Sequence, residues 1–424
     1  MFENLKSDIP VHTPRTASAP KALDGLRVLE LGHYVAGPLG TMIMADMGAD
    51  VIKIESPVRG DEFRHYGPVP PDTPGQGAPY MWCNRNKRSL AIDLKCPEGV
   101  AVVHELFAWA DVVCENFSTG VAERLGLGYK RAKAINPKII WCTVSAYGRD
   151  GAFKDRLGFD PIAQAESGYM SLNGDPDRQP MRSQAAIMDI STAMMACNAI
   201  LGALLARERT NEGQLVEVGL FDTAVLMAGW ATMQHLYTDV EPERFGNVGP
   251  DNCPSGVYAC SDKAFFLHCA NDRIFHRLAT QVLDRPDLVD HPDFLNRTVR
   301  IANKVKINKL LEDIFKQYPW SYWQPRMRDA QIACGEVRTV GEALRSAESQ
   351  DRKLVSRIEH PVLGWVPNIR LPITYSHTPL VDPKPAPALG ENTAEILSEI
   401  LELNAAQIDA LVSTGVLGTA ETAA

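Results

Sequence analysis

The first third of the chain alternates short apolar runs with longer segments of helical spacing, and this alternation limits the possible folds more than any other feature. The segment PEGVAVVHELFAWA, which begins at Pro97, has proline at a helix start and apolar residues at helical spacing. Strands separated by helices in this way form a mainly parallel sheet with helices on both faces. The sequence therefore predicts an α/β fold with a doubly wound parallel sheet. The expected strands are LRVLEL (26–31), DVIKIE (50–55), SLAIDLK (89–95), DVVCENF (111–117) and KIIWCTVSAYG (138–148).

The remainder of the chain predicts a smaller unit between two parts of the large one. A long apolar helix covers 189–208, and a loop rich in Gly, Pro and Asn follows at 246–256. Residues 257–330 mix strand and helix patterns, which indicates a compact α+β unit. The many prolines of 355–390 predict an extended segment running over a surface, before an amphipathic C-terminal helix.

Charge and cysteine usage restrict the class of protein. The net charge of −9 argues against nucleic-acid binding, which requires a basic surface. The nine cysteines include no CxxC pair, so we expect neither disulfides nor a zinc site, and we expect a reducing compartment. No apolar run approaches the length of a membrane span, and the N-terminus lacks a hydrophobic signal core. We therefore expect a cytoplasmic protein that does not bind a membrane.

Several common catalytic motifs are absent. The turn after the first strand, GHYVAGPLG, lacks the GxGxxG spacing that binds a dinucleotide pyrophosphate. The sequence also contains no GxxxxGK[ST] loop, no GxSxG elbow and no HExxH pair. These absences argue against hydride transfer, phosphoryl transfer, serine hydrolysis and metal chemistry, and we expect no tightly bound cofactor.

Asp189 is the only carboxylate in the stretch PMRSQAAIMDISTAMMACNAILGAL, which runs from Pro180 to Leu204. One interpretation is a helix N-cap, because Asp at the start of an apolar helix stabilises it by ~1 kcal/mol. The other is a chemical role. The two are compatible, since a helix N-terminus supplies N–H groups that hold an oxyanion. The local sequence leaves both interpretations open.

Eight stretches, taken in their order and spacing, resemble the family III CoA-transferases. This group contains formyl-CoA transferase, carnitine CoA-transferase and the α-methylacyl-CoA racemases. The resemblance runs from about residue 23 to the C-terminal helix. Its segments are LDGLRVLELGHYVAGPLGTMIMADMGADVIKIE, NRNKRSLAIDLKCPEG, ADVVCENFSTGVAERLGLGY, NPKIIWCTVSAYG, DPIAQAESGYM, IMDISTAMMACNAILGALLARERTNEGQLVEVGLFD, CGEVRTVGEAL and APALGENTAEIL.

The resemblance implies a particular architecture. Residues 1–22 would be an N-terminal arm, and 23–230 the first part of a large CoA-binding domain. Residues 231–335 would form the small α+β domain with its linker, and 336–424 a return strap and the rest of the large domain. Family members are interlocked, ring-like homodimers, so we expect the same assembly here.

The resemblance also implies a reaction. Asp189 matches the family's catalytic aspartate, which exchanges CoA between an acyl-CoA donor and a carboxylic acid through an aspartyl-CoA thioester. The exchange is nearly thermoneutral and uses no ATP, and CoA is a substrate rather than a resident cofactor. A small dicarboxylate such as oxalate or succinate is one candidate acceptor.

Two alternatives remain. The racemase branch has a histidine where this chain has Phe159 and a glutamate near Asp272, and phenylalanine cannot accept a proton. Phe159 therefore favours the transferase. The second alternative is a non-catalytic, CoA-binding subunit of a heteromeric transferase, and the presence of Asp189 argues against it.

Coenzyme A carries three phosphates, so its site needs cationic groups and N–H donors beside an apolar slot. The resemblance implies CoA contacts after the first strand and at the carboxyl end of a later strand, where open α/β sheets bind ligands. These positions are Tyr34, Val35, Ala36, Asn116, Phe117 and Arg124. Further phosphate candidates, each with solvated surface charge as its alternative, are Arg59, Arg64, Lys95 and the basic residues of NRNKRS, Arg85, Lys87 and Arg88. The remaining expected substrate-binding residues are Tyr147, Phe159 and Asp160, the last with a helix cap as its alternative.

Two further positions have structural interpretations. His33, before the CoA-contact turn, is expected to be a packed structural histidine. The loop 246–256 matches the mobile glycine-rich flap of formyl-CoA transferase, and Gly249 and Gly256 remain. Pro250 and Pro254 stiffen the loop, so an equivalent flap motion is not expected.

Overall fold

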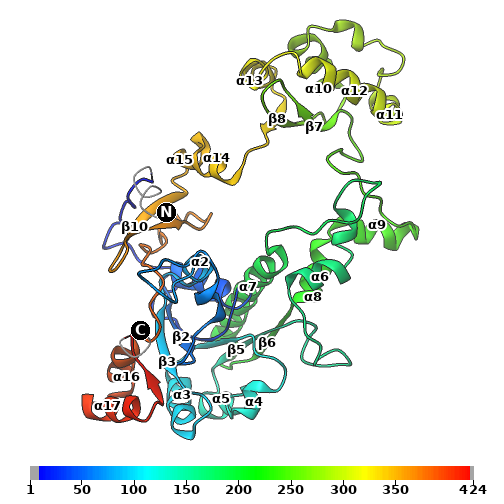
Figure 1. Ribbon diagram of the computed structural model, residues 1–424. Coiled ribbons are helices and arrows are strands. Elements are labelled where there is room, and N and C mark those ends of the chain that lie inside the picture. The colour runs from blue at the N-terminus through cyan, green and yellow to red at the C-terminus, as the bar shows by residue number, and fades with distance from the viewer. Residues whose placement is uncertain (1–8, 421–424) are drawn as a thin grey trace. The chain divides into compact units, whose positions relative to one another are not determined.

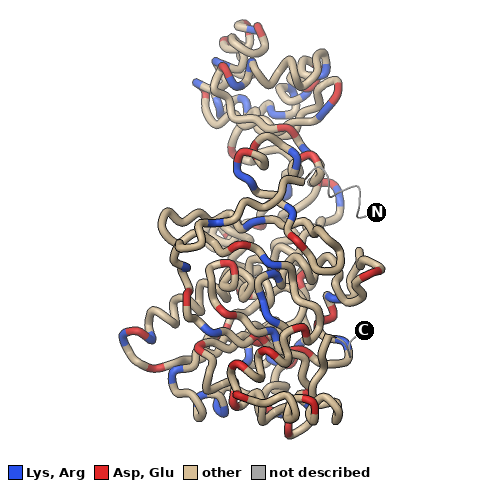
Figure 2. The backbone as a smooth tube through the Cα atoms, turned by 90° about the vertical axis from the view of Figure 1, so that its left-hand side faces the viewer, with Lys and Arg blue, Asp and Glu red and all other residues tan. Residues whose placement is uncertain are grey.

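The structure, a computed structural model, describes residues 9–420, and the chain divides into two compact units. The first unit comprises the chain up to Tyr169, Ser183–Gly229 and the part from Ala347 onward, so early and late segments share it. The second unit comprises Met170–Arg182 and Trp230–Ser346. The resemblance implied that 170–182 and 336–346 belong to the large domain, whereas their contacts place both in the second unit. Basic and acidic residues are interspersed along both units (Figure 2).

A seven-stranded sheet forms the centre of the first unit, in the order β12-β3-β2-β1-β4-β5-β6 (Figure 1). Neighbouring strands pair in parallel, except that β12 pairs antiparallel with β3. The prediction of a large parallel-sheet α/β domain is confirmed. The strands are β1 (Arg27–Leu31), β2 (Asp50–Glu55), β3 (Arg88–Ile92), β4 (Val112–Glu115), β5 (Ile140–Ser145), β6 (Leu215–Gly219) and β12 (Leu417–Gly418).

Alternating residues of the strands bury two separate cores, because successive side chains of a strand point to opposite faces. Val28 belongs to the core beneath α1 and α7, whereas its neighbour Leu29 belongs to the core beneath α3, α5, α16 and α17. Both faces of the sheet are therefore covered. The helices of this unit are α1 (Pro38–Asp46), η1 (Glu62–His65), α2 (Ala78–Asn84), α3 (Pro97–Trp109), α4 (Val121–Arg124), α5 (Tyr129–Ile135), α6 (Asp160–Glu166), α7 (Ile187–Thr210), α8 (Leu220–Met227), α15 (Ala347–Asp351), α16 (Thr393–Leu401) and α17 (Ala405–Ser413).

Helix α7 is the one described helix that is long and apolar enough to cross a membrane by those two criteria alone. The expectation that no segment reaches that length was wrong in this respect. Core helices of globular proteins pass the same test, and α7 packs along α1 and the sheet. Its buried residues are Met188, Thr192, Ala193, Ala196, Cys197, Ile200 and Ala203.

The proline-rich segment begins with a hairpin that the sequence did not predict. Strands β10 (Val355–His360) and β11 (Gly364–Ile369) pair antiparallel. The N-terminal arm is attached to this segment, since Val11 bridges Arg357 and the His12 ring lies 2.9 Å from the Asp382 carboxylate.

The second unit is an α+β structure around an antiparallel sheet of β7 (Ser255–Ala259), β8 (Ala264–His268) and β9 (Ala333–Glu336). An aromatic cluster fills its core, in which the Phe265 ring centroid lies 5.0 Å from Phe315 and 4.9 Å from Trp320. Its helices are η2 (Met170–Leu172), α9 (Trp230–Thr238), α10 (Asp272–Arg277), η3 (Leu278–Val282), η4 (Pro286–Leu288), α11 (Arg297–Ala302), α12 (Lys304–Phe315), α13 (Trp320–Asp329) and α14 (Val340–Arg345).

The glycine-containing loop 246–256 folds back onto β7. The Gly249 N–H donates to the Ser255 carbonyl over 2.9 Å, and Val248 pairs with Gly256. A Cβ atom on Gly256 would lie 2.7 Å from the Asn247 carbonyl oxygen, so glycine is required for this close approach. The absence of flap motion stays a prediction.

Candidate active site

The predicted CoA-contact residues lie where the strand order reverses. Strands β1 and β4 are neighbours in the sheet, although β2 and β3 lie between them in the sequence. The turn Tyr34–Ala36 follows β1, and Asn116 follows β4, so both lie at the carboxyl ends of these adjacent strands. Open α/β sheets bind ligands in the crevice at such a point. The fold therefore brings together two groups of residues that are about eighty positions apart in the sequence.

Asn116 holds the β1–α1 turn in place. Its Oδ1 accepts the His33 N–H over 2.9 Å, and its Nδ2 donates to the His33 carbonyl over 2.7 Å. Gly32 and Gly37 lie beside this side chain, since added Cβ atoms would be in ordinary contact with it at 3.4 Å and 3.7 Å. The polar atoms of Asn116 are thus committed to the turn rather than free for CoA.

His33 and Phe117 pack beside each other in this turn. Their ring centroids are 6.2 Å apart, and the Phe117 N–H donates to Glu115 Oε2 over 2.8 Å. Burial lowers the pKa of His33, and its Nδ1 has no hydrogen-bond partner among the described residues. A neutral, packed ring agrees with the structural role expected for this histidine.

The turn itself contains backbone donors that have no acceptor among the described residues. Tyr34 has a φ of 63°, in the left-handed region, and its N–H donates to Asp61 Oδ1 over 3.1 Å. The N–H groups of Val35 and Ala36 have no acceptor within residues 9–420. Helix α1 begins at Pro38, two residues after Ala36, so these donors lie at the positive end of the helix dipole. They are suited to an anionic oxygen of a substrate.

A cluster of buried charged side chains stabilises the start of this turn. The Lys53 ammonium lies 2.6 Å from Glu30 and 2.9 Å from Asp61, and it donates to the Gly32 carbonyl over 2.7 Å. The side chains of Glu30, Lys53 and Asp61 are inaccessible to solvent. Burial disfavours the charged form of Glu30, yet the cations nearby dominate and lower its pKa. The ion cluster therefore fixes where the turn begins.

Lys87 is part of the same buried cluster, which corrects its assignment as a phosphate candidate. Its ammonium lies 2.6 Å from Glu30 and donates to the Pro38 carbonyl over 2.8 Å. Arg85 pairs with Asp46 over 2.6 Å, and Arg88 pairs with Asp50 over 2.5 Å. The basic segment NRNKRS thus stabilises the fold through internal ion pairs.

Arg64 was also expected to bind phosphate, and the structure contradicts this. Its guanidinium is buried against Glu55, with Nε and Nη2 donating to the carboxylate over 2.8 and 2.6 Å. The remaining donors reach the Tyr80 hydroxyl and the carbonyls of Gly75 and Pro387. All N–H groups of Arg64 are used inside the protein, so none is left for a phosphate.

The other cationic candidates are exposed. Arg59 pairs with Glu62 over 3.1 Å, whereas Lys95 and Arg124 form no ion pair with any described carboxylate. Arg124 lies in α4, shortly after Asn116 and Phe117. Of the predicted cations, Lys95 and Arg124 are therefore unpaired, and the exposed Arg59 uses one N–H group in a surface pair.

Asp189 lies in the first turn of α7 and is not its N-cap. The cap position is Ala186, and it has no side-chain capping bond. The Asp160 carboxylate caps the helix instead. Its Oδ2 accepts the N–H groups of Met188 (2.7 Å) and Asp189 (3.3 Å), while Gln164 donates to Oδ1 over 2.6 Å. The capping alternative thus applies to Asp160. The expectation that these N–H groups hold a reaction oxyanion was wrong for this conformation, because Asp160 occupies them.

The Asp189 carboxyl is partly buried and makes no hydrogen bond to another described residue. Burial, followed by repulsion from Asp160, raises its pKa from 3.8 to about 7. Helix α1 packs closely against α7, since a Cβ on Gly40 would lie 2.9 Å from the Ala193 carbonyl oxygen. Ala193 is one turn beyond Asp189. The carboxyl and the Val35–Ala36 turn therefore lie at the same edge of the sheet.

Aromatic side chains surround the turn. The Tyr34 ring centroid lies 5.3 Å from Phe63, 6.1 Å from Tyr66 and 6.4 Å from Phe159. Phe159 is 59% exposed and directly precedes Asp160. The fold thus brings Phe159 and Tyr34 together.

Tyr147 lies in a separate group of polar contacts. Its hydroxyl donates to Glu166 over 2.7 Å, and the Arg156 guanidinium lies 4.8 Å from the centre of its ring. Burial, followed by the hydrogen bond to Glu166, raises the pKa of Tyr147. A direct contact with substrate stays a prediction for this residue.

One buried ion pair beside the site was not predicted from the sequence. Arg149 binds both carboxylate oxygens of Glu115 over 3.0 Å, and its Nε donates to Thr143 over 3.0 Å. Glu115 is the residue before Asn116, and burial raises its pKa despite Arg149. The one available signal was an acidic residue ending a buried strand. No group of three or more potential metal-ligating side chains occurs within the described part of the chain.

Comparisons with known proteins agree on the class. The sequence model of CoA-transferase family III matches residues 23–393. The succinate–glutarate CoA-transferase of Agrobacterium fabrum is 35% identical over 89% of this chain and 95% of its own length. The succinyl-CoA–D-citramalate CoA-transferase of Chloroflexus aurantiacus is 34% identical over 91% and 95% of the two chains.

Two further proteins extend the comparison. The β subunit of the succinyl-CoA–L-malate CoA-transferase of Chloroflexus aurantiacus is 30% identical over 93% and 98% of the chains. The crystal structure of a CAIB/BAIF family protein from Brucella suis superimposes with a TM-score of 0.83 at 35% identity, covering 90% of this chain and all of that one.

These findings define the class of enzyme as a CoA-transferase that acts on an acyl-CoA and a carboxylate. The chain belongs to CoA-transferase family III.

Proposed function

We propose that this enzyme transfers CoA from a dicarboxylic acyl-CoA, such as succinyl-CoA, to a small dicarboxylic acid, with Asp189 as the nucleophile. The observation that carries the proposal is the Asp189 carboxyl itself. It has no hydrogen bond to another described residue, and its pKa is raised to about 7. A carboxylate with a raised pKa is more basic, and therefore more nucleophilic, than a solvated one.

The reaction begins when a carboxylate oxygen of Asp189 attacks the thioester carbonyl carbon of the donor. The C–S bond breaks, CoA leaves as a thiolate, and the donor acyl group remains as a mixed anhydride with Asp189. The thiolate then attacks the Asp189 carbonyl carbon. The donor acid leaves as a carboxylate, and an aspartyl-CoA thioester remains.

The acceptor acid reverses these steps. Its carboxylate attacks the aspartyl thioester, which releases the thiolate and forms a second anhydride. The thiolate then attacks the acceptor carbonyl, so the new acyl-CoA leaves and Asp189 is restored. Each step exchanges a thiolate and a carboxylate at a carbonyl carbon, and the overall reaction replaces one acyl-CoA thioester by another, so the sequence consumes no ATP.

The β1–α1 turn supports a role in stabilising charge. The free N–H groups of Val35 and Ala36 lie at the start of α1, which packs against the helix bearing Asp189. We propose that they donate to an oxyanion or to a phosphate of CoA. Arg124 and Lys95 are the proposed phosphate contacts, because their side chains are exposed and unpaired among the described residues.

The names of the relatives suggest the substrates. Those described above act on succinate, glutarate, D-citramalate and L-malate, which are all dicarboxylic acids. We therefore propose a dicarboxylic acid as acceptor. Incubation with succinyl-CoA and a panel of these acids, followed by mass spectrometry of the CoA thioesters, identifies the acceptor.

Chemical trapping tests the intermediate directly. Hydroxylamine added during turnover should convert Asp189 to a hydroxamate, which a peptide map detects as a mass change on that residue. An unmodified Asp189 peptide under turnover, together with a fully active Asp189→Ala variant, would exclude the mechanism. Exchange of the α-proton for deuterium without an acceptor would instead support the racemase alternative.

We further propose that the chain forms the interlocked homodimer implied by its family. Helices α6 to α8 pack together and expose apolar side chains, among them Ile162, Met194, Leu205 and Leu226 at 43%, 49%, 66% and 64% exposure. Exposed apolar surface of this kind is typical of an interface. Light scattering after size exclusion should give a mass near twice 46.6 kDa. A folded but inactive monomer would favour the heteromeric-subunit alternative.

The predicted cytoplasmic location belongs to this proposal as well. All nine cysteines are free thiols in the structure, which supports a reducing compartment. Fractionation of cells that express the chain would test it.

A further inference from the structure

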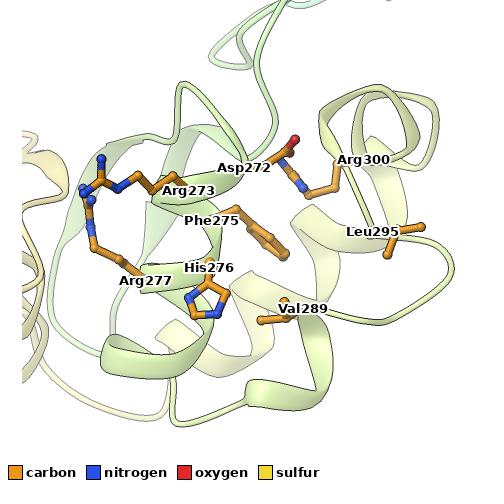
Figure 3. Close-up of a pocket in the computed structure, with 8 residues that line it drawn as sticks. All are labelled: Asp272, Arg273, Phe275, His276, Arg277, Val289, Leu295 and Arg300. Atoms are coloured by element: carbon orange, nitrogen blue, oxygen red, sulfur yellow. The ribbon is translucent and has the colours of Figure 1, made fainter.

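The second unit contains a cavity of about 460 Å³ beside α10, lined by three arginines together with apolar side chains. Arg273, Arg277 and Arg300 line it, and Asp272 is its one carboxylate (Figure 3). Asp272 is already neutralised, since its Oδ1 lies 2.6 Å from the Arg300 guanidinium. The cavity therefore carries positive charge in a chain whose net charge is −9.

Arg300 has a structural role, and its charge is paired with that of Asp272. Its side chain is 1% exposed, and besides Asp272 it donates to the carbonyls of Cys253 (2.8 Å) and Phe294 (3.0 Å). Its guanidinium also lies 4.2 Å from the centre of the Phe275 ring. The excess charge of the cavity therefore comes from the other two arginines.

Arg273 and Arg277 are available to a ligand. They are four residues apart on α10, and Figure 3 shows both side chains extending from the helix in the same direction. Arg273 has no hydrogen bond or ion pair among the described residues. Arg277 donates once, from Nη2 to the Gln331 carbonyl over 3.0 Å, while its Nε is buried without a partner.

Two like charges at this spacing repel each other, and a buried N–H without an acceptor costs free energy. An anion between the guanidinium groups would remove both penalties. The apolar lining residues Phe275, Val289 and Leu295 lie on the other side of α10 from the two guanidinium groups (Figure 3). His276, also on α10, adds a further donor at the rim.

We propose that Arg273 and Arg277 form a binding site for an oxyanion, either a carboxylate or a phosphate. Guanidinium groups bind both oxyanions through paired N–H donors. The two available sources are the carboxylic acids of the reaction and the phosphates of coenzyme A. The site does not depend on the role of Asp189.

Arginine footprinting with phenylglyoxal tests the proposal at the level of single residues. The full chain is labelled in HEPES buffer with phosphate, glutarate, CoA or 3′-dephospho-CoA, and with chloride at equal ionic strength as the reference. Peptide mapping then gives the labelling rate of each arginine. At an anion concentration of about ten times Kd, labelling of Arg273 and Arg277 should slow roughly tenfold, because only the free site reacts.

Arg328 is the internal control, since it is an exposed arginine on α13 of the same unit and does not line the cavity. Its rate should not change. Protection by glutarate identifies the acid as the source, whereas protection by CoA that is lost with 3′-dephospho-CoA identifies the 3′-phosphate. In the Arg273→Gln variant, protection of Arg277 should fall at least severalfold, while an Arg328→Gln variant should retain it.

Labelling rates of Arg273 and Arg277 that are the same with every anion as in chloride would overturn the proposal. So would complete resistance of both residues to labelling in chloride, which would show a closed cavity. The Asp189→Ala variant separates this site from the proposed reaction. It should lose CoA transfer yet keep the protection of Arg273 and Arg277.

Discussion

The Asp160 carboxylate accepts the backbone N–H of Asp189, so one aspartate caps the helix that presents the other. The same oxygen accepts the Met188 N–H, and Gln164 holds the second oxygen. This arrangement fixes the first turn of α7 and places a negative charge next to Asp189. Two acidic residues with different surroundings thus take different roles, one structural and one proposed as chemical.

Replacement of Asp189 should abolish transfer. If its carboxylate forms the covalent intermediate, Asp189→Ala lowers kcat by at least about 10³-fold, a loss typical of removed nucleophiles. The assay is CoA transfer from succinyl-CoA, followed by mass spectrometry. Asp155→Ala is the matched control, because Asp155 is exposed on the same unit, and it should keep full activity. Comparable activity in both variants would contradict the proposal.

The charge of Asp160 should contribute to the pH dependence, in addition to the burial of Asp189. Repulsion from Asp160 contributes to the raised pKa of Asp189, so Asp160→Asn should lower that pKa. The acid limb of the profile of kcat/KM against pH then moves below about 7, because Asp189 stays ionised at lower pH. The asparagine oxygen still accepts the Met188 N–H.

Gln164→Leu is the control for this prediction. It removes a hydrogen bond to Asp160 but keeps the charge, so the acid limb should not move to lower pH. An unchanged profile in Asp160→Asn would show that Asp189 ionisation does not limit the reaction.

The raised pKa of Asp189 also predicts a stability effect. Between pH 3.8 and about 7, the folded state binds a proton that the unfolded state has lost, so stability falls as pH rises through this window. Asp189→Asn removes the ionisation. The variant should melt a few degrees above the natural protein at pH 8, and the two should converge towards pH 4. A lower Tm for the variant at pH 8, measured by calorimetry, would contradict this sign.

Removal of Lys53 should affect both stability and substrate affinity. Lys53→Met leaves Glu30 and Asp61 buried with fewer cations, which costs about 3–5 kcal/mol of unfolding free energy. The Gly32 carbonyl also loses its donor, so the turn that carries Val35 and Ala36 is released.

Urea denaturation measures the loss of stability, and steady-state kinetics should show a higher KM for acyl-CoA with a smaller change in kcat. Lys21→Met is the matched control, because Lys21 pairs with Asp24 at the surface and should cost less than about 1 kcal/mol. A kcat effect without a KM effect would show that the turn does not bind CoA.

The strands of the large domain could be predicted because their information is local. β2 matches the predicted 50–55 in full, and the other predicted strands differ from the observed ones mainly at their ends. The hairpin of β10 and β11 was missed, because the prolines of its segment hid the alternation of the two strands. Helix α17 was not predicted. Strand β12 was also missed, since a strand of two residues forms only by pairing with β3.

The sequence alone determined the alternation of strands and helices, the order of the family segments and the isolation of Asp189 among apolar residues. Only the tertiary structure decided which charges are free. Arg64 and Lys87 are ordinary basic residues in the sequence, but Glu55 and Glu30 bind them inside the protein. Asp160 is an ordinary helix-start aspartate until α7 folds against it. A charge is neutralised by partners distant in the chain, so its availability is a property of the folded structure.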